Sequence, residues 1–115
     1  MGKPSKLDAE YSVKVPINGT STGTRLALTT ASAALTAGRL VVGATYKVAL
    51  TAGASDAAWV DLTGGTAAAP ASNDAVVAGF WLNPGESEVV LASVNKLSGI
   101  MLSGTGTLLI TRLVT

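Results

Sequence analysis

The chain has 115 residues, which is the length of one domain with a single core. It contains neither cysteine nor histidine, which excludes disulfides, thiolate metal sites and histidine-based acid–base catalysis, so we expect no enzymatic activity and no cofactor. Eight basic and seven acidic side chains leave a net charge of +1, which gives no reason to expect a nucleic acid or a membrane as a partner.

The first element in chain order is an N-terminal arm. Residues 1–10 are polar and lightly basic, and residues 11–17 (YSVKVPI) alternate apolar with polar side chains, as a strand does. Because Pro16 has no N–H to donate, this segment is expected to be an edge strand or an extended arm laid on a surface. We therefore assign residues 1–19 to an extended N-terminal arm and edge strand, and residues 20–115 to a single β domain.

About eight further segments combine Val, Ile, Leu and Thr with Gly-rich boundaries, which is typical of strands. They are residues 25–30, 32–36, 44–52, 57–63, 75–82, 86–92, 96–102 and 107–113.

Turn residues between these segments suggest which strands follow each other as hairpins. The first two segments are expected to form a pair that ends at Gly38, and Asn83-Pro84-Gly85 is expected to join 75–82 to 86–92. The last two segments are interpreted as two strands and a turn. The loop 63–74 is long for a compact β domain.

This spacing of strands predicts an all-β fold. We expect an antiparallel β-sandwich of the jelly-roll type, with two four-stranded sheets; a small up-and-down or Greek-key β-barrel is the alternative.

Acidic residues offer two possible chemical sites. Glu86 and Glu88 lie two apart on one strand and could act as a glycosidase pair in a cleft, but a charged edge that blocks strand pairing is the preferred interpretation. Asp56, Asp61 and Asp74 could converge on calcium, which favours oxygen ligands. Their spacing matches no EF-hand and aspartate is common in turns, so no metal site is predicted.

The two tryptophans are expected to lie in different environments. Trp81 follows Phe80 in an apolar run and is predicted to be in the core. Val60 and Leu62 would share the inward face of their strand, which sends Trp59 and Asp61 outward. Trp59 would then be an interface anchor, unless it packs under the long loop. The candidate interface residues are Lys3, Pro4, Lys6, Tyr11, Lys14, Pro16, Trp59 and Asp61.

Three turn-and-strand motifs, taken in order, resemble the arrangement found in a known class of proteins. They are Asn73-Asp74 before an apolar strand, Leu82-Asn83-Pro84-Gly85 after it, and the closing Ser103-Gly104-Thr105-Gly106-Thr107-Leu108. In this arrangement, residues 20–115 are similar to small β-rich virion proteins of tailed bacteriophages. The resemblance implies a capsid decoration (cement) protein or a piece of a head or tail fibre. The chain lacks a long repetitive shaft, which favours the decoration role.

Composition points in the same direction. Only 13% of the residues are charged, compared with about 25% in an ordinary soluble domain, so we expect an assembly to cover much of the surface. The resulting hypothesis is a protein made in the host cytoplasm and located on the capsid surface of the virion. Its expected partners are the major capsid protein and itself, with a homotrimer favoured and a dimer possible. The alternative is a receptor- or glycan-binding module that uses the loop 63–74 and Trp59.

Overall fold

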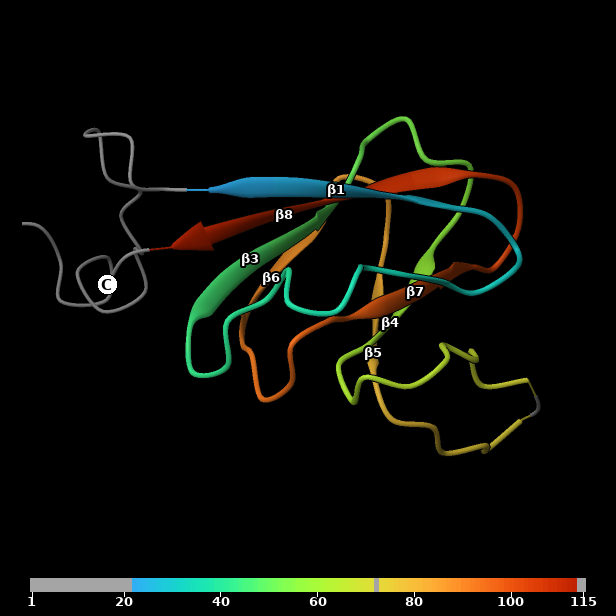
Figure 1. Cartoon of the computed structure of the whole chain (residues 1–115). Coiled ribbons are helices and arrows are strands. Elements are labelled where there is room, and N and C mark those ends of the chain that lie inside the picture. Colours follow the sequence, from blue (N-terminus) through green and yellow to red (C-terminus); the bar gives the residue numbers. More distant parts are fainter. Residues whose placement is uncertain (1–21, 72, 114–115) are drawn as a thin grey trace, which may run out of the picture.

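The computed structural model describes residues 22–71 and 73–113, and all of their regular structure is β (Figure 1). No helix in these two ranges is long and apolar enough to cross a membrane. The strands are β1 (Gly23–Leu28), β2 (Ala33–Ala34), β3 (Thr45–Leu50), β4 (Ala58–Asp61), β5 (Phe80–Leu82), β6 (Ser87–Leu91), β7 (Ser98–Met101) and β8 (Gly106–Leu113).

The eight strands form two four-stranded antiparallel sheets. The first sheet has the order β1-β8-β3-β6 and the second has the order β2-β7-β4-β5. Strand β1 therefore pairs with β8, β2 with β7, β3 with β6 and β4 with β5, as in a long hairpin folded over on itself. This is the strand order of a jelly roll, which confirms the predicted all-β sandwich. Because the sheets are separate, the alternative of a closed barrel is not realised.

The expected pairing of neighbouring strands at Gly38 and at Asn83–Gly85 is wrong, whereas the last two segments do form two strands with a short connection between them. Strands β5 and β6 lie in different sheets, as do β1 and β2, and β7 and β8. The turn at Asn83–Gly85 carries the chain from one sheet to the other: the Gly85 N–H donates to the Leu50 carbonyl, at 2.9 Å. Among the eight described strands, only β4 and β5 follow each other within one sheet, and the long connection 62–79 separates them.

Strand β5 is shorter than expected because the backbone before it is not extended. Asp74 has φ 68° and Gly79 has φ 134°, so the apolar residues between them belong to the connection 62–79 rather than to a strand. The extended run begins only at Phe80.

The core lies between the sheets and is built by alternate residues of each strand. Strand β3 contributes Tyr46, Val48 and Leu50, and β8 contributes Leu108 and Ile110. The facing side chains of the second sheet are Ala58, Val60, Leu82 and Met101. Each large side chain buried in this way stabilises the fold by about 1.5–3 kcal/mol.

Candidate functional site

The structure places only two of the predicted interface residues. Lys3, Pro4, Lys6, Tyr11, Lys14 and Pro16 lie outside the described residues. Trp59 and Asp61 lie on the outer face of the second sheet but are each only 6% exposed, so the prediction that they point into solvent is wrong. The reason is the connection 62–79. Its start and its end lie against this face, while its middle projects away from the sandwich (Figure 1).

Trp59 is covered by the end of that connection. Its indole Nε1 donates to the Ala78 carbonyl at 3.1 Å. A Cβ on the next residue, Gly79, would lie 2.6 Å from Trp59 Nε1 and would also collide with the Val60 carbonyl. The second possibility for Trp59, packing under the long connection, is therefore confirmed.

Trp81 is the exposed tryptophan, and its predicted place in the core is wrong. It lies on the edge strand β5 directly opposite Trp59 and is 40% exposed, whereas its neighbour Leu82 is buried. The two indoles meet edge to face, with ring centroids 4.9 Å apart and an interplanar angle of 75°. This contact packs part of the Trp81 ring against Trp59, and the rest of the indole is an exposed apolar surface at the sheet edge.

Asp61 holds the start of the connection. Its Oδ1 accepts hydrogen bonds from the Thr63 N–H at 2.7 Å and from the Thr63 hydroxyl at 2.6 Å. Close by in the same sheet, the Ser98 hydroxyl donates to the Gly65 carbonyl at 2.6 Å. Asp61 therefore has a structural role in fixing the turn that follows β4.

The three aspartates considered for calcium do not form a site. Within residues 22–71 and 73–113, no three acidic side chains group closely enough to hold a metal ion. Asp56 instead links two loops, because its Oδ1 accepts from the Ala57 N–H at 2.7 Å and its Oδ2 from the Ser103 hydroxyl at 2.8 Å. The backbone bond, followed by the hydroxyl bond, holds the pKa of Asp56 below its usual value.

Glu86 and Glu88 lie at an edge, as the preferred interpretation has it. Strand β6 is the last strand of the first sheet, and both side chains are exposed. Glu86 Oε1 accepts from the Asn83 N–H at 2.7 Å and so fixes the turn before β6.

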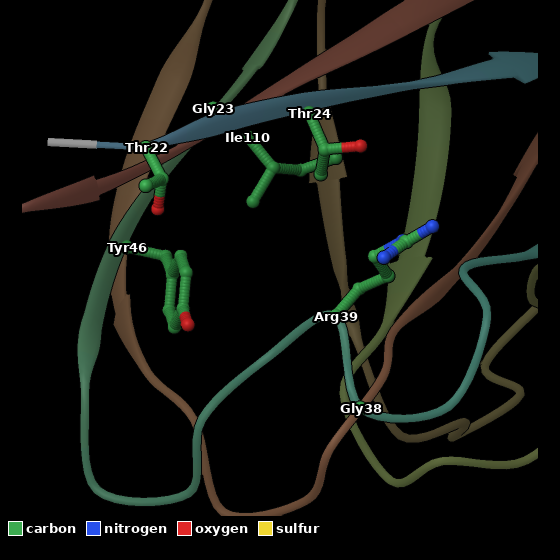
Figure 2. A pocket seen from close by; sticks show the side chains of 7 residues that line it. All are labelled: Thr22, Gly23, Thr24, Gly38, Arg39, Tyr46 and Ile110. Carbon is green, nitrogen blue, oxygen red and sulfur yellow. The ribbon is translucent and has the colours of Figure 1, made fainter.

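A polar cavity of about 350 Å³ lies beside β1. Figure 2 shows Tyr46 and Arg39 on opposite sides of it, with Thr22 and Thr24 above. The Tyr46 hydroxyl accepts from the Val41 N–H at 2.8 Å, which leaves its own proton free to donate. Sequence reasoning did not identify this cavity, because its residues come from Thr22 and β1, the segment before Val41, β3 and β8, which meet only in the folded sandwich.

Besides Trp81 and the cavity, a third candidate for a binding surface is the outer face of the first sheet, which we call the open sheet face. Two rows of paired residues cross it: Arg25–Leu109–Ala49–Ser87 and Gly23–Thr111–Lys47–Val89. Leu109 is 41% exposed, Val89 50%, and Leu91, which follows Val89 on the same face, 65%. Arg25 and Lys47 carry the only charges in the two rows. The solvated face of an antiparallel sheet is ordinarily polar, so the three exposed apolar side chains Leu109, Val89 and Leu91 make this face a candidate contact surface.

Alternation in the sequence could have revealed this face. In residues 107–113, Leu108 and Ile110 would both point inward as alternate residues of a strand. Leu109 lies between them and would therefore point outward as an exposed apolar side chain.

These surfaces differ in extent. The open sheet face spans all four strands of a sheet, whereas Trp81 is one side chain on an edge strand and the cavity lies at the side of β1. No protein-family model, curated protein or solved structure matches the chain.

Proposed function

We propose that this chain is a structural protein of a tailed-bacteriophage virion, a decoration protein that binds the outside of the capsid in many copies and stabilises it. The observation that carries the proposal is the open sheet face, with exposed Leu109, Val89 and Leu91 and no acidic side chain in its two rows. The likeness of the turn motifs in residues 20–115 to small virion proteins supports the same role.

The chemistry of the open sheet face suggests what it would bind. Interface cores contain few charged residues, and the few here are both cations, Arg25 and Lys47. The proposed contact surface of the major capsid protein is therefore largely uncharged, with carboxylates placed to meet these two cations. Such docking buries apolar area that is exposed in the free protein, so it favours the assembled shell by mass action.

Multiple copies follow from the symmetry of a shell. Closed symmetry suits trimers at three-fold positions and dimers at two-fold positions, and the trimer is favoured. In either case each copy presents the same face to an equivalent site.

The test is the copy number of the polypeptide in purified particles of the phage that encodes it, measured by quantitative mass spectrometry against the major capsid protein. A ratio close to a simple fraction of the shell protein is the expected result. A few copies per particle would instead indicate a tail or fibre component, and absence from the particles would overturn the proposal.

Trp81 supports a second candidate, a glycan-binding module of a head or tail fibre. An exposed, oriented indole can stack on the apolar face of a sugar ring. Because Trp59 is buried and Trp81 is exposed, Trp81 is the tryptophan proposed for this role. A glycan array decides the matter: a reproducible hit that Trp81→Ala abolishes supports the module, and an array without hits removes it.

A further inference from the structure

Among the described residues no strand lies beyond β6, so one edge of this strand exposes backbone groups beside apolar side chains. The Leu50 N–H donates to the Glu86 carbonyl, and the Ala92 N–H donates to the Ala44 carbonyl. Both bonds belong to the pairing of β3 with β6, and both involve even-numbered residues at the two ends of β6. Because hydrogen-bonded pairs alternate along an antiparallel ladder, the even-numbered residues of β6 direct their N–H and C=O groups toward β3. The odd-numbered residues Ser87, Val89 and Leu91 direct theirs toward the free edge.

We propose that residues 11–17 of a second copy of this chain add to this edge as an antiparallel strand. The sequence YSVKVPI has apolar side chains at odd positions and a cation, Lys14, at an even one. Strand β6 has exposed Val89 and Leu91 at odd positions and Glu88 at an even one. With Lys14 opposite Glu88, Val13 lies opposite Val89 and Tyr11 opposite Leu91, so apolar and opposite-charge pairs form on separate faces.

Pro16 fits this register. In it, odd-numbered residues of the arm exchange hydrogen bonds with Ser87, Val89 and Leu91, while even-numbered residues face away from β6. The missing N–H of Pro16 therefore falls on the outer side of the new strand, where no ladder bond is required. The same proline would then prevent a further strand from adding.

The length of the chain requires the strand to come from another copy. In this register Ile17 lies in the row of Gly85, at the Glu86 end of β6. Thr22 lies in the row of Val90, on the far side of the sheet. Its carbonyl accepts from the Arg112 N–H, and Arg112 lies opposite Tyr46. Tyr46 in turn lies opposite Val90.

The separation follows from the strand order. Four strand spacings of about 4.8 Å and five rows of about 3.4 Å separate the two residues by about 26 Å. The chain from Ile17 to Thr22 spans at most about 18 Å.

Arm exchange has two consequences. It fills the edge of β6 with a strand whose Lys14 matches Glu88, so the acidic residue that opposes unspecific strand pairing becomes part of a specific pair. It also links copies to one another, either reciprocally in a dimer or around a ring such as the trimer, and it requires no shell. The inference therefore goes beyond the proposed function and can be tested on the purified protein alone.

Engineered disulfides test the pairing directly, since the natural chain has no cysteine. Full-length Val13→Cys and Val89→Cys variants are mixed, oxidised and analysed by mass spectrometry of the linked peptides. The Cα atoms of such a pair are about 5.5 Å apart, within the range for a disulfide. We expect a disulfide that joins position 13 of one chain to position 89 of another.

The matched control is Val13→Cys mixed with Glu88→Cys, whose side chain lies on the opposite face of β6. Equal linking to positions 88 and 89, or no link to position 89, would overturn the proposed register. In the double variant Val13→Cys/Val89→Cys, a link confined to one chain would overturn the exchange.

Charge reversal tests the same contact without cross-linking. Lys14→Glu and Glu88→Lys should each weaken self-association measured by sedimentation velocity about fivefold or more, because each replaces an attractive cross-strand pair with a repulsive one. The double variant Lys14→Glu/Glu88→Lys should recover it. A chain that is monomeric at about 100 μM, or single variants that associate like the natural chain, would contradict the proposal.

Discussion

The outer faces of the two sheets differ, although their strands follow the same alternating pattern. On the second sheet, Trp59 and Asp61 point outward but are covered by the ends of the connection 62–79. On the first sheet, Leu109 and Val89 also point outward, and among the described residues no comparable connection covers them. The difference shows that alternation determines the face of a side chain, whereas the path of a connection determines its exposure.

The strongest test of the covered face is a comparison of the two tryptophans. Trp59→Ala should lower the free energy of unfolding by about 3–5 kcal/mol, because it removes a buried indole and its bond to the Ala78 carbonyl. Trp81→Ala should cost about 1 kcal/mol, mainly the edge-to-face contact. Urea unfolding of both variants measures this. Equal losses would show that the two indoles are not in different environments.

Closing the connection over Trp59 depends on Gly79. Gly79→Ala should destabilise the fold by about 3 kcal/mol, since its φ of 134° is strained for alanine and the Cβ would collide with Trp59 and Val60. The control is Gly53→Ala, where a Cβ would have no atom within 4 Å. Thermal unfolding measures both, and a Gly79→Ala variant as stable as Gly53→Ala would contradict this packing.

The start of the connection can be loosened separately. Asp61→Ala should lower the free energy of unfolding by about 1–3 kcal/mol, because it leaves the N–H and the hydroxyl of Thr63 without their acceptor. Hydrogen exchange at the Thr63 amide should accelerate as well. Unchanged exchange in the variant would show that Asp61 does not hold the turn.

The smallest expected effect lies at the loops joined by Asp56, away from the covered face. The folded state depresses the pKa of Asp56, so this group stabilises the fold above its unfolded pKa of about 3.9, and the stabilisation is lost as the pH falls through the folded value. Asp56→Asn should therefore flatten the decline in stability as the pH falls below the unfolded pKa. Urea unfolding across that range measures it. Ser103→Ala should flatten the decline partly, because it removes one of the two hydrogen bonds to Asp56. If stability declines as steeply in both variants as in the natural chain, Asp56 is not the source of the pH dependence.

The fold class was predictable because it depends on local patterns. Alternating apolar residues between Gly-rich turns indicated eight strands, and their regular spacing indicated a sandwich. Which strands pair was not predictable in the same way. The sequence around Asn83-Pro84-Gly85 is equally compatible with a hairpin and with a crossing between sheets. The choice depends on Gly85 meeting Leu50, a contact between segments far apart in the chain.

The candidate sites were predictable only in part. Alternation placed Trp59 on the outer face correctly, but the positive φ values of Asp74 and Gly79, which return the connection over it, are not visible in the residue pattern. The cavity beside Arg39 and Tyr46 depends on the distance between β1 and a loop, which no local pattern encodes.

The central claim is that the open sheet face is the surface that contacts the shell. Hydroxyl-radical footprinting of the chain in purified particles, compared with the free protein, tests it most directly. We expect Leu109 and Val89 to become protected in the particle while Trp81 keeps its reactivity. Protection of Trp81 with Leu109 and Val89 unchanged would contradict it and would assign the contact to the second sheet.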